Sequence, residues 1–194
     1  MIFTRRVVVT GMGAVTPIGI GVQNFRISLR EGACGVGPLT RFESNGLGSR
    51  NVFEVKNFIP PKGAKQLDPF IQYALAATAE AIENAGFKPE TEDPFRIGVC
   101  VGSSKGGLHS FYRLHEKFLK QPNFALATRG FSNLIPHFAS QWISKNGNSG
   151  ARPNVMSPHA LREQLLSLKG PEWFRTGHWI MQWPGQATLR LCRF

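Results

Sequence analysis

The sequence predicts a layered α/β fold, in which buried mixed or parallel strands are covered by helices. Two short runs rich in β-branched residues and bounded by glycine, 7–10 and 96–104, indicate buried strands. Apolar residues recur at helical spacing in two further stretches, 68–85 and 108–120. Strands that alternate with helices indicate a mostly parallel sheet with covered faces.

The first strand lies at the start of the chain. We expect it over Val7 to Thr10, followed by a turn at Gly11 and Gly13. A helix over 22–29 comes next, because three apolar residues there share one face, and Gly32 ends it.

The middle of the chain holds the most strongly predicted helix. Residues 50–58 alternate weakly and suggest an edge strand, and 60–63 form a proline- and glycine-rich loop. Asp68-Pro69 then supplies an N-cap side chain and a proline in the first turn. The helix continues to Ala85, and Gly86 ends it. One face of this helix carries Ile71, Leu75, Thr78 and Ile82.

The second strand, Arg96–Ser104, ends in a turn of small residues that includes Gly106 and Gly107. An amphipathic helix over Leu108–Lys120 follows this turn. Beyond residue 135 the texture changes, and 178–185 shows neither helix nor strand period. We therefore divide the chain into a folded portion, 1–135, and a tail, 136–194, whose fold the sequence does not indicate.

Composition favours a globular protein without a membrane span. Of the 194 residues, 42% are hydrophobic and 18% are charged. No apolar run reaches the roughly 18 residues that a span needs, and Met1–Arg6 lacks the apolar core of a signal peptide. The 3 cysteines are too scattered for a disulfide framework. We expect a cytoplasmic protein.

The net charge of +11 raises the possibility of nucleic-acid binding. The basic residues are spread along the chain, however, and no basic run is interleaved with aromatic residues. A solvated basic surface explains the charge better. Such a surface also suits an acidic protein partner.

Four segments together resemble the β-ketoacyl-acyl-carrier-protein synthases, the condensing enzymes of fatty-acid synthesis. In chain order they are Arg5–Gly19, Arg26–Gly37, Asp68–Tyr73 with its alanine-rich helix, and Arg96–Leu108. The last two are similar to the family's "D-x-F-x-x-Y/A" helix and its "G-x-x-x-G-S-G-x-G-G" strand and turn. The resemblance covers the N-terminal portion of the family's sequence and implies a thiolase-like fold, of which this chain holds an incomplete first half.

The resemblance also implies a reaction and its partners. In the family, a cysteine thiolate at a helix N-terminus takes an acyl chain from an acyl carrier protein as a thioester. Two histidines then assist decarboxylation of a malonyl group and attack of the resulting carbanion. The implied partners are the acyl carrier protein and a second copy in a homodimer. No cofactor, metal, nucleic acid or membrane is implied.

The catalytic residues of the family are not visible in this chain. The nucleophile belongs to a motif of the type T-A-C-A-x-G and is expected near His159–Ala160, where the chain reads Ser157–Arg162. The resemblance places the catalytic histidines beyond Phe194. None of the cysteines (Cys34, Cys100, Cys192) has the helix-start context of a nucleophile, and Cys100 is expected to be a buried small hydrophobe. The histidines (His109, His115, His137, His159, His178) show no metal-ligand spacing.

One turn remains as a candidate site. Neither phosphate-binding glycine spacing is present between residues 102 and 107. In the family this turn borders the acyl pocket, which implies that role for Ser104, Lys105, Gly106 and Gly107. Lys105 stands where an apolar residue is usual, so the preferred acyl chain length is open.

The genetic code offers an explanation for the tail. When each codon's third base is joined to the first two bases of the next codon, some residues of the shifted frame are forced. They are Val at Trp173–Phe174, Leu at His178–Trp179, Asp at Trp179–Ile180, and Ala at both Met181–Gln182 and Trp183–Pro184. All fall where the family's sequence has them, and the His159–Ala160 junction permits cysteine. We therefore expect a frame shift between about Phe138 and Ser157.

Two interpretations of function follow. In the first, the chain is a truncated, frameshifted and inactive β-ketoacyl synthase, an acyltransferase by family. In the second, it is a non-catalytic partner subunit of a condensing system. The glycine-turn architecture does not favour a nucleic-acid-binding protein.

Overall fold

The structure, a computed structural model, describes residues 8–41, 43, 46, 48, 51–93, 96–103, 105–121, 128–146, 152–155, 178–182 and 187–193. The strands are β1 (Val8–Thr16), β2 (Gly19–Ile20), β3 (Val36–Pro38), β4 (Asn51–Phe53), β5 (Ile97–Val101), β6 (Arg152–Val155), β7 (His178–Gln182) and β8 (Ala187–Arg193). The helices are α1 (Val22–Arg30), α2 (Pro69–Ala85), α3 (Leu108–Lys120), α4 (Thr128–Ser132) and α5 (His137–Asn146), with a 3₁₀ turn at Pro89–Thr91.

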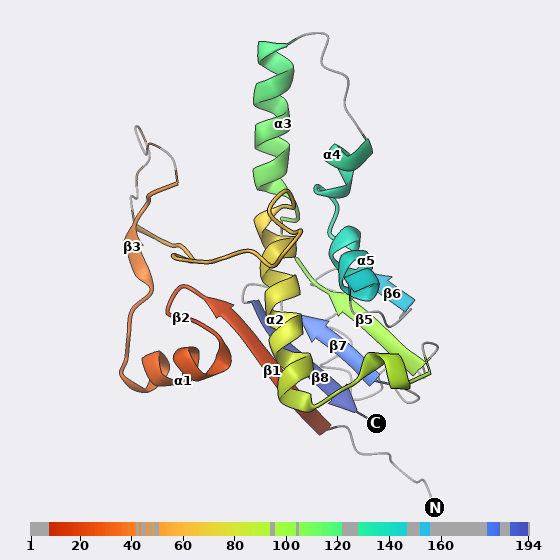
Figure 1. Cartoon of the computed structure of the whole chain (residues 1–194). Coiled ribbons are helices and arrows are strands. Elements are labelled where there is room, and N and C mark those ends of the chain that lie inside the picture. The colour runs from red at the N-terminus through yellow and green to blue at the C-terminus, as the bar shows by residue number, and fades with distance from the viewer. Residues whose placement is uncertain are drawn as a thin grey trace, which may run out of the picture.

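The described strands form a mixed sheet with helices packed on it. Six strands take the order β2-β1-β8-β7-β5-β6, and β3 and β4 form a separate pair. β5 runs parallel to β6 and β7, whereas β1 pairs antiparallel with β2 and β8. Figure 1 shows α2 and α5 on the same side of this sheet. The predicted layered α/β class is confirmed, but the expectation of a mostly parallel sheet is wrong.

β1 is longer than predicted and passes through both of its glycines. The predicted turn at Gly11 and Gly13 is wrong, because α2 crosses β1 at these positions. A Cβ atom on Gly11 would collide with the carbonyl oxygen of Ala81, and one on Gly13 with that of Ala77. The glycines therefore permit close approach of helix and strand instead of a change in chain direction.

The beginning of β1 is also less buried than predicted. Val8 and Val9 are 51% and 47% exposed, whereas Ala14 and Val15 are 1% and 3% exposed. The chain reverses after Thr16, and β2 pairs back on β1. The predicted helix over 22–29 is confirmed as α1.

α2 confirms its predicted start and end. The side chain of Asp68 accepts a hydrogen bond from the Phe70 N–H at 3.2 Å, and Pro69 occupies the first turn. Gly86 ends the helix with a left-handed backbone at φ 58°. Ile71, Leu75 and Thr78 of the predicted face are buried.

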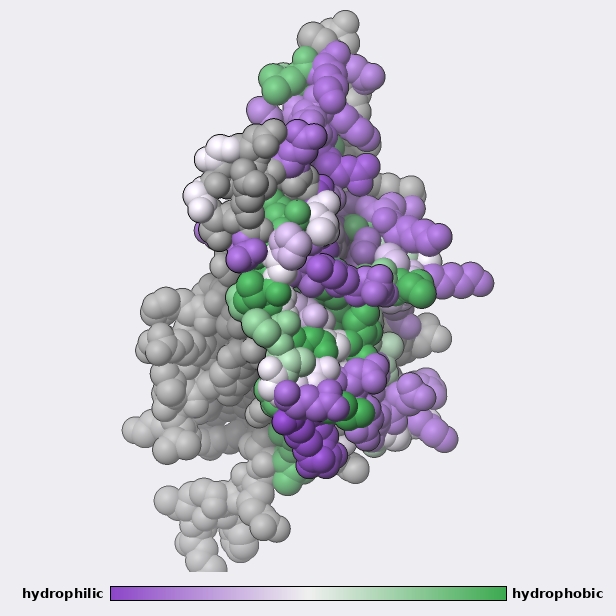
Figure 2. Space-filling view, turned by 90° about the vertical axis from the view of Figure 1, so that its left-hand side faces the viewer, coloured by the Kyte–Doolittle hydropathy of each residue, from purple (hydrophilic) through white to green (hydrophobic). Residues whose placement is uncertain are grey.

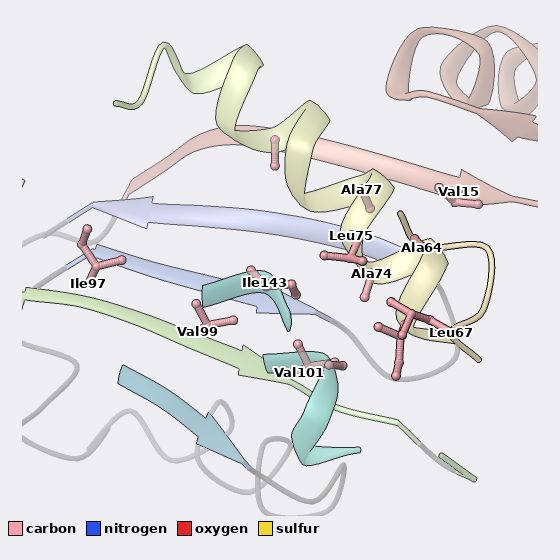
Figure 3. Close-up of a cluster of buried hydrophobic side chains, with 13 residues drawn as sticks. Val15, Ala64, Leu67, Ala74, Leu75, Ala77, Ile97, Val99, Val101 and Ile143 are labelled. Carbon is pink, nitrogen blue, oxygen red and sulfur yellow. The ribbon is translucent and has the colours of Figure 1, made fainter. Parts of the chain in front are cut away.

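The main core lies between α2, β5 and α5, as Figure 3 shows. Ile97, Val99 and Val101 alternate along β5, so they share one face and meet Ala139 and Ile143 of α5 there. Cys100 points to the other face and is fully buried, which confirms its expected role as a small hydrophobe. The division of the chain at residue 135 stays a prediction.

The tail contains strands that its sequence did not indicate. Residues 178–185 were expected to be irregular, yet His178–Gln182 forms β7 between β5 and β8. A strand paired on both edges gains its hydrogen bonds from its neighbours and needs no alternating pattern of its own.

β4 is shorter than the edge strand expected over 50–58. It pairs with β3, and Glu54 follows it directly. The Glu54 carboxylate accepts hydrogen bonds from the Thr40 hydroxyl at 2.6 Å and from the backbone N–H groups of Thr40 and Arg41. These donors stabilise the charged form and hold the pKa of Glu54 below its ordinary value of 4.5, although burial opposes them.

α3 extends away from the sheet beyond the N-terminal end of α2 (Figure 1). Its predicted range is confirmed, but none of its residues is buried.

Hydrophobic residues also reach the surface elsewhere. Figure 2 shows some of them in the middle of one face, with hydrophilic residues above and below.

Candidate functional site

The turn between β5 and α3 is held by hydrogen bonds from two backbone N–H groups. The Gly106 N–H donates to the Ser103 hydroxyl at 3.0 Å, and the Gly107 N–H donates to the Leu134 carbonyl at 3.0 Å. Gly106 has φ 60°, a conformation that favours glycine. Lys105 is exposed, and Ser104 lies outside the described residues.

Both glycines of this turn also allow it to lie directly on the segment that follows α4. A Cβ atom on Gly107 would collide with the carbonyl oxygen of Asn133, and one on Gly106 would lie 2.8 Å from that of Leu134. The backbone at residues 133–134 therefore forms one wall of the site, in direct contact with the turn.

Asp68 joins this turn to α2. One carboxylate oxygen caps α2 through the Phe70 N–H, and the other accepts a hydrogen bond from the Ser110 N–H at 2.8 Å. Ser110 lies in the first turn of α3, which has no side-chain cap of its own. Asp68 is only 3% exposed, so one buried carboxylate fixes the starts of both helices.

A cavity of about 650 Å³ lies beside Asn133. Its lining combines apolar and polar side chains: Gln66, Leu67, Gly130, Ser132, Asn133, Phe138, Gln141, Trp142 and Lys145. Asn133 donates through Nδ2 to the Gln66 carbonyl at 3.0 Å. Its Oδ1 atom is buried and accepts no hydrogen bond from the part of the chain that the structure describes. A buried acceptor left unpaired costs about 1–3 kcal/mol.

A second cavity of about 430 Å³ adjoins the first. Gln66, Gly130 and Asn133 line both cavities. The second is basic, because Lys65, Arg113 and Lys117 surround it together with Ser110 and Leu114. No acidic residue occurs among the described residues that line either cavity.

The other residues considered from sequence are not brought together. Cys34 is exposed, Cys100 is buried in β5, and Cys192 lies in β8. His109 and His115 are exposed on α3, His137 begins α5, and His178 begins β7. His159 and Ala160 lie outside the described residues. Within the described ranges, no three potential metal ligands among His, Cys, Asp and Glu form a group.

Sequence reasoning missed Asp68 as a cap for two helices and Asn133 as an unpaired acceptor. The N-cap of α2 was predicted, but its second hydrogen bond depends on where α3 packs. Nothing in the sequence near Asn133 distinguishes it from a polar loop residue.

Among the described helices, none combines the length and apolar character required to cross a membrane.

Comparisons with known proteins assign the family. Residues 4–151 match the model of the beta-ketoacyl synthase N-terminal domain. A 3-oxoacyl-[acyl-carrier-protein] synthase 2 of Synechocystis sp. is 35% identical over 145 residues, which are 72% of this chain and 33% of that relative. The synthase 2 of Vibrio cholerae is 34% identical over 144 residues, with the same coverage. The chain thus spans about a third of the length of these curated relatives.

Solved structures share the fold at lower sequence identity. The ishigamide ketosynthase/chain length factor matches with a TM-score of 0.74 and 21% identity, covering 97% of this chain and 58% of that one. A beta-ketoacyl synthase from Burkholderia phymatum matches with a TM-score of 0.70 and 22% identity, covering 92% of this chain and 46% of that one. These matches confirm the thiolase-like fold class expected from the sequence.

Proposed function

Because the chain belongs to the β-ketoacyl synthase family, we propose that it is the N-terminal part of a condensing enzyme of fatty-acid biosynthesis. The single observation that carries this proposal is the family match over residues 4–151, which includes β1, α2 and the β5–α3 turn. In the complete enzyme, a cysteine thiolate would take the acyl group from its carrier thioester. A malonyl thioester would then lose CO₂, and its carbanion would displace the cysteine from the acyl carbonyl.

The role of the β5–α3 turn in this proposal is to form one wall of the acyl pocket. Ser104, Lys105, Gly106 and Gly107 are the residues concerned. The hydrogen bond from Gly107 to Leu134 and the cap from Asp68 to Ser110 support a fixed position for this wall. A wall of fixed position can select chain length by shape.

The reading frame shifts within the chain, between about Phe138 and Ser157, so that this chain does not itself condense acyl groups. The forced residues of the shifted frame support this part of the proposal. The family match ends at residue 151, and this end lies within the same interval.

The partner of the proposed enzyme is an acyl carrier protein, and the enzyme works as a homodimer in the cytoplasm. The net charge of +11 supports an acidic partner. So do the cations of Lys65, Arg113 and Lys117, which gather on one side of the β5–α3 turn. One of the solved neighbours is a type II ketosynthase in complex with its acyl-carrier protein.

The second candidate is a non-catalytic partner subunit. It is favoured by the absence of cysteine from Ser157–Arg162 in the present frame. Two solved neighbours, each pairing a ketosynthase with a chain length factor, have the same fold.

The nucleotide sequence of the gene from codon 130 to well past codon 194 distinguishes the two candidates. For the frameshifted synthase, we expect the shifted frame to stay open and to encode cysteine across the His159–Ala160 junction, with histidines further on. A shifted frame that closes within a few codons would refute the frame shift and leave the non-catalytic subunit.

The acyl-pocket role of the turn is tested in the protein encoded by the corrected frame. An ammonium group at the pocket wall disfavours apolar chains, so Lys105→Leu should raise the relative rate of acylation by long-chain over short-chain acyl carriers about tenfold. Lys88→Leu, a change at another exposed lysine just after the C-terminal end of α2, serves as the control. Equal chain-length profiles in both variants would remove Lys105 from the pocket.

A further inference from the structure

The loop that precedes α2 makes two turns and is anchored in the core at both. The Ala64 N–H donates to the Pro61 carbonyl at 2.9 Å, and the Leu67 N–H donates to the Ala64 carbonyl at 3.0 Å. The side chains of Ala64 and Leu67 are 2% and 7% exposed and belong to the hydrophobic core. Lys65 lies between them and is exposed. The backbone of this loop, which we call the docking loop (residues 61–67), therefore fixes where the Lys65 side chain leaves the surface.

Two side-chain amides bind three consecutive carbonyl groups of the docking loop. Gln72 of α2 donates through Nε2 to the Leu67 carbonyl at 2.8 Å and to the Lys65 carbonyl at 3.4 Å. Asn133 donates through Nδ2 to the carbonyl between them, that of Gln66, at 3.0 Å. The loop is thus held from α2 on one side and from the segment after α4 on the other.

Asn133 makes its hydrogen bond at a cost to stability. Its Oδ1 atom is buried and accepts no hydrogen bond from the described part of the chain, whereas buried acceptors in folded proteins are nearly always paired. The bond from Nδ2 to the Gln66 carbonyl is exposed, so water could take its place. Stability alone does not account for an asparagine here, but a need to hold the docking loop does.

The same segment also holds the turn between β5 and α3. Leu134, the residue after Asn133, accepts the hydrogen bond from the Gly107 N–H at its carbonyl. Adjacent residues thus bind the docking loop and this turn. A carrier protein that binds at Lys65 would lie at a fixed position relative to the proposed pocket wall.

We propose that Gln72 and Asn133 are positioning residues for docking of the acyl carrier protein. They hold the docking loop in the conformation that it has when the carrier is bound, and Lys65 makes the contact. A loop that is already ordered loses less conformational freedom on binding, so the carrier binds more tightly. This inference rests on the carrier partner of the proposed function and adds residues that act through the loop.

A double-mutant cycle tests whether Gln72 acts through Lys65. Fluorescence anisotropy measures the affinity of the full chain for a labelled acyl carrier protein. We expect Lys65→Gln to weaken binding about fivefold and Gln72→Met, which removes both hydrogen bonds, about threefold. In a chain that already carries Lys65→Gln, Gln72→Met should weaken binding no further.

The cycle separates failure of this inference from failure of the proposed function. An equal effect of Gln72→Met with and without Lys65→Gln would overturn the positioning role alone. A wild-type chain that does not bind the carrier, or that binds it equally well after Lys65→Gln, would overturn the proposed carrier contact and the positioning role with it.

Thr78→Val is the matched control for a buried polar-to-apolar change on α2. Thr78 is 4% exposed, and its hydroxyl donates to the Ala74 carbonyl within the helix. This variant should bind the carrier as the wild type does, and a threefold loss would mean that the stability of α2 sets the affinity, against the proposal. Asn133→Leu should show the same dependence on Lys65 as Gln72→Met, and it decides the question if Gln72→Met does not fold.

The rigidity of the docking loop can be measured without a partner. We expect NMR order parameters of about 0.85 for the N–H groups of Lys65 and Gln66 in the wild type, and lower values in Gln72→Met. Wild-type values below about 0.6, or equal values in the two proteins, would overturn the positioning role even if the carrier binds.

Discussion

At the scale of single residues, Gly13 is the position where the fold depends most directly on the absence of a side chain. A Cβ atom there would overlap the carbonyl oxygen of Ala77 and lie 2.8 Å from its carbonyl carbon. These are backbone atoms of α2, which cannot rotate away. We expect Gly13→Ala to lower the free energy of unfolding by about 3 kcal/mol. The thermal unfolding midpoint of the variant measures this loss.

Gly48→Ala is the matched control for this substitution. A Cβ atom at Gly48 meets nothing within 4 Å, so this change should be neutral or stabilising by up to about 1 kcal/mol. Equal unfolding midpoints for the two variants would show that α2 does not lie against β1 as described.

Glu54 gives a pH dependence whose sign is set by its hydrogen bonds. The Thr40 hydroxyl, followed by the N–H groups of Thr40 and Arg41, lowers the pKa of Glu54 in the folded chain. Stability from this carboxylate is therefore complete above its unfolded pKa and is lost as the pH falls through the lower, folded pKa. We expect the difference in unfolding midpoint between the wild type and Glu54→Gln to be constant near neutral pH and to shrink below about pH 4.5. A Glu54 pKa at or above 4.5, measured by NMR titration, would contradict this.

Sequence pattern predicts a residue's surroundings only where residues close to it in sequence form those surroundings. Cys100 lies within a β-branched run, and its burial was predicted correctly. The orientation of the Asn133 side-chain amide, which leaves its oxygen unpaired, depends on the hydrogen bond from Nδ2 to the Gln66 carbonyl, and Gln66 is distant in sequence. Sequence pattern therefore indicated the turn at Gly106 and Gly107 but gave no indication of the cavities next to it.

At the scale of elements, α2 supplies the N-terminal caps that its neighbours lack. Neither α1 nor α3 has a side-chain cap of its own. Glu80 of α2 accepts hydrogen bonds from the N–H groups of Val22 at 2.6 Å and Ala14 at 2.9 Å, which ties α1 and β1 together. Asp68 does the same for α3. The two carboxylates therefore fix the positions of both flanking helices on one central helix.

Asp68→Asn tests this arrangement at α3. An asparagine offers one acceptor oxygen, so it can cap α2 or α3 but not both. We expect a loss of about 1–2 kcal/mol in the free energy of unfolding. Amide hydrogen exchange should become faster at Ser110 or Phe70, whichever loses its acceptor.

Glu83→Gln, an exposed acid-to-amide change on the same helix, should alter neither quantity. Exchange at Ser110 and Phe70 that is as slow in Asp68→Asn as in Glu83→Gln would mean that Asp68 does not bridge the two helices.

Elements were predictable where their start and end are marked in sequence. α2 has Asp68, Pro69 and Gly86 as its boundaries, and all three were identified. The glycines of β1 were misread as a turn, because a glycine required for close packing and one required for a turn look alike in sequence. β7 was missed since a central strand is stabilised by pairing with its neighbours.

At the scale of the whole molecule, the chain exposes apolar surface that a stable monomer would cover. One face of α3 presents Leu108, Phe111, Tyr112, Phe118 and Leu119, and each of these is more than half exposed. Val8, Val9 and Met12 add exposed apolar area on β1. The apolar face of α3 is a contiguous surface of the kind that promotes association or capture by chaperones.

Self-association through α3 should therefore be sensitive to a single polar substitution on this face. Leu119 is 66% exposed and lies within the apolar stripe, whereas Ile59 is 84% exposed in a loop away from it. Leu119→Gln should shift the sedimentation velocity profile toward the monomer, because it interrupts the apolar stripe. Ile59→Gln is the control: it removes an apolar side chain of equal size and should leave the profile unchanged. Ile59 belongs to no helix or strand, and a single exposed apolar side chain of this kind does not drive association. A wild-type chain that sediments as a monomer and melts in one sharp transition would show instead that α3 needs no cover.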